Sequence, residues 1–476
     1  MSPSEHFENK TIPPQDGTVT STAAAALNAS TAHDVTSRDV KIASWICFFA
    51  WTFAVYDFVL FGNLLPQLAA SLGWSEAHST EVNTWVTAGT ALVAFAIGPL
   101  TDKIGRRKGI LVAVAGAALA SLLTATVGWV YGIAAGLGLV FLVVVRSIAG
   151  LGYAEQAINA AYLNEMFAHR YSDPAKARRR GLIYSLVQSG WPVGSVLAAS
   201  SVYLLFPIGG WELCFAVAAL PAVFILWAGR WLKESPQFRR RQEVDGLRSA
   251  GHTDEARERA QAYGISSEKQ SSPITAVFRG ESLRPTLVIG SAFLLNWVGV
   301  LAFSILGTSL LTAESGKNIS FDNALTILIV SNATAFLGYL FHGWLGDRIG
   351  RRNTIGLAWI VCSLCFFAML QAPDGNYPLI VALYSAGLFF LIGPFSALLF
   401  FTGESFPVHT RATGSSLINA SGQVGAIIGG VLITATLSAG QSWETATLWW
   451  GCLPILAAGL LVFAAPNVDP RTVRTD

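Results

Sequence analysis

The sequence has few charged residues for its length. Of its 476 residues only 13% are charged, whereas about 25% are charged in a typical soluble domain. The net charge is +2, which excludes the strongly basic surface expected of a nucleic-acid-binding protein. Residues 1–41 contain no apolar core of a secretory signal peptide, and their Ser, Thr, Ala and Asp predict a disordered tail.

Cysteine is also scarce, and the motifs of common enzymes are missing. The five cysteines all fall in apolar stretches, and the C-x-x-C formed by Cys362 and Cys365 has no further ligands near it, so no metal site is predicted. The chain has no G-x-S-x-G, no H-E-x-x-H and no phosphate-binding loop. We therefore expect neither an enzyme nor a bound cofactor.

Apolar residues are abundant instead. They make up 53% of the chain, and the mean hydropathy is +0.50. Since a helix needs about 20 apolar residues to cross a bilayer, the pattern predicts an all-α membrane protein with twelve spans. These spans are residues 42–70, 81–100, 109–128, 136–167, 180–206, 211–232, 284–312, 323–345, 354–371, 377–402, 412–438 and 444–464.

The positive charges separate cleanly between the two sides of this topology. The two tails and the connections that follow spans 2, 4, 6, 8 and 10 together hold 29 of the 31 Lys and Arg residues. The opposite side has only Lys317, and Arg146 lies inside a span. Because cytoplasmic segments are enriched in Lys and Arg, we expect both termini in the cytoplasm and the protein in the plasma (inner) membrane.

The spans divide the chain into five regions. They are an N-tail at 1–41, a six-helix bundle at 42–233, a cytoplasmic central loop at 234–283, a second six-helix bundle at 284–465 and a C-tail at 466–476. Within the central loop, Thr253 is expected to cap one short surface helix.

A repeated motif gives the strongest family resemblance. One copy lies between spans 2 and 3 and the other between spans 8 and 9; the residues are Gly98, Asp102, Gly105, Arg106 and Arg107, and Gly343, Asp347, Gly350, Arg351 and Arg352. Both copies resemble the cytoplasmic loop signature of the major facilitator superfamily. The resemblance implies a transporter that works as a monomer, with two six-helix bundles around a central cavity.

Two further segments resemble particular branches of that superfamily. Tyr56-Asp57-Phe58 in span 1, and the run from Arg146 to Glu155 in span 4, resemble the metabolite:proton, aromatic acid:proton and sialic acid:proton symporters. Ala54 stands where the aromatic acid and sialic acid branches carry a first Asp. Glu234-Ser235-Pro236 is shared with the sugar porters, but residues 293–297 lack their Gln-Gln signature.

The ionisable residues inside the spans are candidates for function, since each costs about 2.5–3.5 kcal/mol to insert. We expect Asp57 and Glu155 to carry protons, although a structural hydrogen bond would also explain Asp57. Asn159 follows Glu155 by one helical turn and shares its face. Arg146 suits a substrate carboxylate, or it pairs with Asp57; the sequence leaves both open.

The remaining candidates are polar or aromatic residues in the spans. Possible substrate contacts are Tyr56, Asn159, Asn296, Trp297 and Tyr384, although helix-to-helix contacts explain them equally well. A cytoplasmic gate network is expected from Glu165, Arg179, Glu404 and Arg411, because related transporters carry such Glu and Arg sets. Solvated helix ends are the alternative for these four residues.

The function predicted from the sequence is proton-coupled uptake of a small organic anion, such as an aromatic or other carboxylic acid. The partners are then the substrate, protons and the lipid bilayer. A sugar or polyol carrier and a proton-antiport efflux pump remain alternatives. A membrane sensor would need a folded signalling domain, and the central loop and tails look too short and polar for one.

Overall fold

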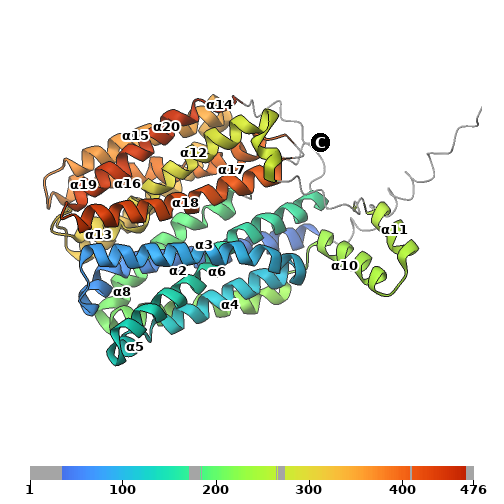
Figure 1. The fold of residues 1–476 in the computed structure, drawn as a ribbon, viewed down its shortest axis with the longest axis horizontal. Coiled ribbons are helices and arrows are strands. Elements are labelled where there is room, and N and C mark those ends of the chain that lie inside the picture. The colour runs from blue at the N-terminus through green and yellow to red at the C-terminus, as the bar shows by residue number, and fades with distance from the viewer. Residues whose placement is uncertain are drawn as a thin grey trace, which may run out of the picture.

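The computed structural model describes residues 35–170, 183, 185–263, 265, 274–407 and 410–467, and within these ranges the regular structure is helical. Long helices run side by side in two groups (Figure 1). The first group contains α2 (Ser37–Leu72), α3 (Glu76–Ile104), α4 (Arg106–Thr124), α5 (Val127–Ile133), α6 (Ala135–Arg170), α8 (Gly190–Ala218) and α9 (Leu220–Ala228). The second contains α12 (Leu283–Val300), α13 (Gly307–Thr312), α14 (Phe321–Ile349), α15 (Arg351–Leu370), α16 (Tyr377–Ile392), α17 (Phe395–Glu404), α18 (Arg411–Ser438), α19 (Trp443–Thr447) and α20 (Leu453–Val462).

Eleven helical stretches of the described residues are long and apolar enough to cross a bilayer. One of them, Ser185–Trp231, has 47 residues and holds both α8 and α9. Its backbone leaves helical geometry at Gly209 and Gly210, where Gly210 has a φ of +65° that favours glycine. The chain turns here between two spans, so the eleven stretches account for the twelve predicted spans.

Both copies of the repeated motif form tight turns between long helices. Gly105 joins α3 to α4 with a φ of +97°, and Gly350 joins α14 to α15 with a φ of +87°. Both values lie in the left-handed region, where a side chain would add strain. The two motifs therefore require glycine at equivalent places for the same backbone reason.

The central loop contains more structure than we predicted. α10 (Pro236–Ser249) precedes α11 (Thr253–Ala262), and the two helices lie beyond the end of the long helices (Figure 1). They share a small core of Val244, Ala256 and Ala260. The capping prediction was wrong: Thr253 is the first residue of α11, and His252 occupies the cap position without a side-chain hydrogen bond.

The two groups of helices close against each other on the side away from the motif turns. The Thr308 hydroxyl donates a hydrogen bond to Asn63 Oδ1 at 3.3 Å. Gly62 lies against the Ile305 carbonyl with no room for a side chain. This contact falls in a wider π-helical turn, Leu301–Ile305, that continues α12. The described residues of the two groups are therefore in direct contact on this side.

Candidate functional site: a central cavity and two buried acidic residues

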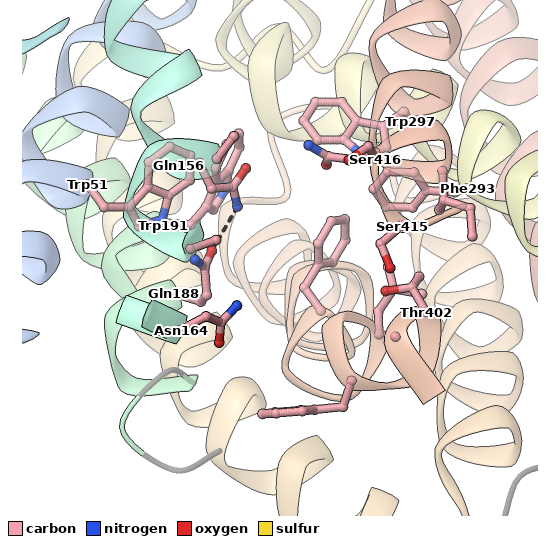
Figure 2. A pocket seen from close by; sticks show the side chains of 18 of the residues that line it. Trp51, Gln156, Asn164, Gln188, Trp191, Phe293, Trp297, Thr402, Ser415 and Ser416 are labelled. Atoms are coloured by element: carbon pink, nitrogen blue, oxygen red, sulfur yellow. Dashed lines mark hydrogen bonds between the residues drawn. The ribbon is translucent and has the colours of Figure 1, made fainter. Parts of the chain in front are cut away.

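A cavity of about 640 Å³ lies between the two groups of helices. Trp51, Gln156 and Trp191 are on one wall, and Phe293, Trp297 and Ser416 face them from the other (Figure 2). The described residues that line it are Trp51, Tyr153, Gln156, Ala157, Ala160, Asn164, Phe167, Gln188, Trp191, Phe293, Trp297, Val300, Tyr339, Ile392, Phe395, Leu398, Phe400, Thr402, Gly403, Arg411, Ser415, Ser416, Ile418 and Asn419.

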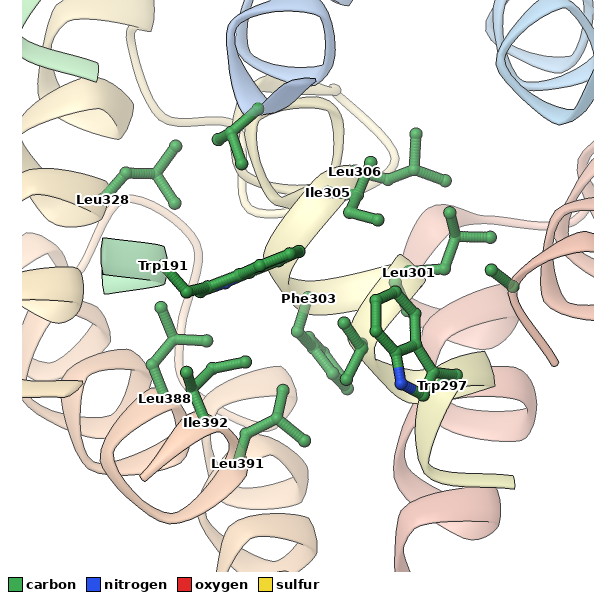
Figure 3. Close-up of a cluster of buried hydrophobic side chains, with 14 of the residues drawn as sticks. Trp191, Trp297, Leu301, Phe303, Ile305, Leu306, Leu328, Leu388, Leu391 and Ile392 are labelled. Atoms are coloured by element: carbon green, nitrogen blue, oxygen red, sulfur yellow. The ribbon is translucent and has the colours of Figure 1, made fainter. Parts of the chain in front are cut away.

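Aromatic side chains from both groups close the inner end of this cavity. The Trp297 ring packs edge-on against Tyr153 at 6.2 Å and against Trp191 at 6.0 Å. Trp191 and Trp297 lie beside Phe303, Ile305 and other buried apolar residues (Figure 3). These aromatic contacts cross from α6 and α8 to α12, so the inner end would have to separate before a ligand could pass.

The other end of the cavity reaches toward the motif turns. Asn164 and Phe167 lie in the last turns of α6, Thr402 lies near the end of α17, and Arg411 begins α18. Among the described lining residues Arg411 is the only charged one, and its Nε is buried without a hydrogen-bond partner. The cavity is therefore mainly apolar and aromatic, with one positive group near its mouth.

Asp57 and Arg146 form an ion pair outside the described lining of the cavity. Arg146 Nη1 lies 3.2 Å from Asp57 Oδ1 and 3.3 Å from Oδ2, and Nη2 donates to the Asp57 carbonyl at 3.0 Å. The Ser121 hydroxyl also donates to Asp57 Oδ1. The rings of Phe61 and Phe215 each lie 5.2 Å from the guanidinium. In this arrangement Arg146 is the partner of Asp57 and does not reach the cavity.

A separate small void borders this ion pair. It has a volume of about 20 Å³ and is lined by Asp57, Ser121 and mostly small residues such as Ala54, Ala117 and Gly152. A space of this size is enough for a single water molecule.

Glu155 is fully buried in α6, away from the cavity lining. Neither of its carboxylate oxygens has a hydrogen-bond partner in the described part of the chain, and the Asn159 side chain is the polar group beside it. Asn159 itself donates to the Cys47 carbonyl at 3.1 Å. The expected shared face of Glu155 and Asn159 thus packs against α2 rather than forming a cavity wall.

The acids at the ends of α6 and α17 pair with the repeated motifs. Glu165 Oε1 lies 3.3 Å from Arg106 Nε, and Glu404 Oε1 lies 2.7 Å from Arg351 Nη1. Arg106 also bonds Asp102 at 2.7 Å. The partners we expected were Arg179, which falls outside the described residues, and Arg411, which lines the cavity. Arg411 also acts electrostatically on Glu404, so the expected network stays a prediction, to which the structure adds the motif arginines.

Several predicted substrate contacts lie away from the cavity. Trp297 does line it, whereas Asn159, Asn296, Tyr56 and Tyr384 are buried elsewhere. Tyr384 donates its hydroxyl to the Phe303 carbonyl, which explains it as a helix-to-helix contact. Both amide atoms of Asn296 are buried without a hydrogen-bond partner in the described structure.

The sequence analysis missed most of the lining. Trp51, Tyr153, Gln156, Gln188 and Trp191 all face the cavity. Trp51 lies five residues before the Tyr56-Asp57 segment, and Tyr153 lies two residues before Glu155. Nearness to those segments was the available signal for Trp51, Tyr153 and Gln156. Gln188 and Trp191 lie in span 5, outside both segments.

Comparison with known proteins places these features in a family. The family model of the Major Facilitator Superfamily matches residues 46–430 and again 292–475. The chain is 26% identical over 440 residues to a gallate transporter of Pseudomonas putida, covering 90% of this chain and 93% of that protein. It is 24% identical over 452 residues to the niacin transporter NiaP of Acinetobacter baylyi, with coverage of 90% and 95%. The sialic acid transporter NanX of Escherichia coli is 24% identical over 439 residues, with coverage of 89% and 93%.

Solved structures agree on the fold. A crystal structure of a D-xylose-proton symporter superposes with a TM-score of 0.63 at 17% identity, covering 92% of this chain and all (100%) of that one. The predicted major facilitator fold is thus confirmed, and the expectation that the chain is not an enzyme agrees with these transporters. The chain belongs to the Major Facilitator Superfamily and is a secondary transporter embedded in a membrane.

Proposed function

We propose that this transporter carries a small organic anion, an aromatic or other carboxylic acid, into the cell together with protons. The central cavity carries this proposal. Nine of its 24 described lining residues are aromatic, and its only charged group among the described lining residues is Arg411. Flat rings stack well on such walls, while a lone guanidinium favours an anion.

The substrate is proposed to bind on the motif side of the contact between Trp191 and Trp297, with its ring against the aromatic part of the wall. Its carboxylate would then point toward Arg411, Ser415 and Asn164 at the outer end of the cavity. The similar gallate and niacin transporters support this choice, because gallate and niacin are both aromatic carboxylic acids. A role for Arg146 as the carboxylate ligand is not retained, since Asp57 occupies both of its Nη groups and Arg146 does not line the cavity.

Asp57 is proposed as the main proton carrier, with Glu155 as a second. A proton on Asp57 would weaken its ion pair with Arg146 and free that guanidinium to move. α2 carries both Asp57 and the cavity residue Trp51, and α6 carries both Arg146 and Tyr153. Movement of either helix would therefore link the protonation of Asp57 to the shape of the cavity.

The remaining parts of the proposal concern topology and gating. We propose that both termini lie in the cytoplasm, that the protein is in the plasma (inner) membrane, and that it acts as a monomer. The pairs Arg106–Glu165 and Arg351–Glu404 would hold the cytoplasmic ends of the two bundles and rearrange as the cavity closes. The positive charge of the motif-bearing side supports this orientation.

Uptake into vesicles tests the proposal directly. Radiolabelled aromatic carboxylates, their uncharged amides and a set of sugars are offered with and without an inward proton gradient. We expect the carboxylates alone to accumulate, and only with the gradient. Accumulation of a sugar but of no carboxylate would overturn the substrate class, and accumulation independent of pH would overturn proton coupling.

A further inference from the structure

The short 3-10 turn after α9, Gly229–Trp231, carries an arginine that lies against two tryptophan rings. The Arg230 guanidinium lies 4.4 Å from the centre of the Trp227 ring and 4.6 Å from that of Trp231. The two rings meet edge-on at 4.3 Å. These two cation–π contacts restrain the position of the guanidinium.

Arg230 is exposed, and it makes no hydrogen bond or ion pair with the residues that the structure describes. The neighbouring motif arginines are all engaged: Arg107, for example, donates from Nε to the Gly229 carbonyl at 3.2 Å. The Arg107 guanidinium thus lies beside Gly229, the residue before Arg230, and adds a second positive charge there. The site is therefore a positioned cation with free donors at the surface of a membrane helix.

An exposed row of aromatic residues leads from Arg230 across the surface of α9 and α2. Phe224 contacts Trp227 at 6.2 Å and Phe49 at 5.9 Å, and Phe49 stacks on Trp45 at 5.9 Å. Trp45, Phe224, Trp227 and Trp231 are 55%, 47%, 49% and 47% exposed. We call this set, with Phe49, the aromatic stripe. Its rings offer an apolar surface that ends at a cation.

We propose that Arg230 and the aromatic stripe bind an anionic phospholipid of the leaflet at the motif end of the protein. The phosphate would accept hydrogen bonds from Arg230, since a guanidinium pairs with phosphate through two parallel bonds. The acyl chains would lie along Phe224 and Phe49, which are deeper in the membrane than Arg230, while Trp45 lies nearer the interface. Tryptophan and tyrosine are enriched at membrane interfaces in general. Here the two tryptophan rings also position Arg230, which has no hydrogen bond or ion pair in the described structure and can therefore contact a headgroup.

A second copy of this chain is the other candidate occupant of the stripe. It is disfavoured because Arg230 would then face the same positive corner of its partner across a two-fold interface, and like charges repel. The lipid supplies the complementary charge. This inference is independent of the substrate, because neither Arg230 nor any residue of the aromatic stripe is among the described residues that line the cavity.

Native mass spectrometry of the purified protein tests the lipid site. Wild type, Arg230→Ala, Arg230→Lys and Arg239→Ala are each titrated with phosphatidylglycerol and with phosphatidylcholine. Arg239 is exposed on α10 and has no aromatic ring contact in the described structure, so its variant removes the same charge elsewhere. Melting temperatures of the same preparations show that each variant is folded.

We expect wild type and Arg239→Ala to prefer phosphatidylglycerol equally. Arg230→Ala should bind it about fivefold more weakly, from about 1 kcal/mol per arginine near a charged surface. Arg230→Lys should lose part of the preference, because lysine keeps the charge but cannot form the two parallel bonds. Trp231→Leu should also weaken binding, because the guanidinium loses one of its supporting rings. An unchanged preference in Arg230→Ala, an equal loss in Arg239→Ala, or dimers that dissociate in Arg230→Ala would each overturn the proposal.

Discussion

Arg146 holds Asp57 through both carboxylate oxygens and through the main-chain carbonyl of the same residue, at 3.0–3.3 Å. The two residues are 89 positions apart in the chain, on α2 and α6. Their side chains are 7% and 3% exposed. A buried ion pair of this kind gives up its attraction when the acid takes a proton, which makes it a natural point for a proton to act on the packing of two helices.

Asp57→Asn is expected to abolish accumulation of substrate driven by a proton gradient. The amide imitates the protonated acid and cannot release a proton, whereas the cavity itself is untouched. Exchange of labelled for unlabelled substrate should therefore persist. The measurement is uptake and exchange in vesicles, with and without an imposed gradient.

The control for this variant is its stability, since removing one partner of a buried ion pair costs about 3–5 kcal/mol. Arg146→Gln combined with Asp57→Asn should recover part of that loss in thermal unfolding. If Asp57→Asn still accumulates substrate in response to pH, Asp57 is not the coupling group, and Glu155→Gln is the next variant to measure.

Arg411→Gln is expected to raise the KM for an aromatic carboxylate by about ten- to hundredfold, the value of a hydrogen bond to a charged group. The amide of the same acid has no charge to lose and should bind the variant and wild type alike. Arg239→Gln, an exposed arginine on α10, is the matched control. Equal losses for acid and amide would show that Arg411 supports the cavity without contacting the carboxylate.

Lys317→Met is expected to destabilise the protein by about 2–3 kcal/mol. Lys317 is 1% exposed, and its Nζ donates to the carbonyls of Leu370 and Ala372 at 2.8 and 2.9 Å. It also pairs with Asp374 and Glu444. One cation thus joins three connections on the side away from the motif turns, and methionine fills its volume without supplying a donor.

Thermal unfolding of purified Lys317→Met measures this loss. Lys103→Met removes an exposed lysine from the end of α3 and is the control. A melting temperature for Lys317→Met that falls no further than that of Lys103→Met would mean that the surrounding oxygens find water instead.

Cysteine labelling tests the proposed orientation. Ala250 and Glu314 are both exposed, and they lie at opposite ends of the long helices. In whole cells a membrane-impermeant maleimide should label Glu314→Cys and should reach Ala250→Cys only after permeabilisation. The native cysteines are replaced first, although four of the five are buried. Labelling of Ala250→Cys in intact cells would reverse the orientation.

The spans and the family resemblance follow from the sequence by itself. An apolar stretch of about 20 residues must cross the bilayer whatever its neighbours are, because lipid satisfies no backbone hydrogen bonds. The turns at Gly105 and Gly350 were equally readable, since their glycines and arginines recur in two copies. In the structure, spans 5 and 6 fall within one helical stretch, and the break in helical geometry at Gly209 and Gly210 separates them.

The tertiary structure decided which face of each helix meets the cavity. Hydropathy places both Arg146 and Trp191 inside spans. The rotation of each helix then directs Arg146 toward Asp57 and Trp191 into the cavity. The partners of Glu165 and Glu404 were also set by packing, because the motif turns bring Arg106 and Arg351 to them from distant segments. Hydropathy indicates whether a residue lies in the membrane. It gives little information about the rotation of a helix when its lipid-facing and protein-facing sides are both apolar.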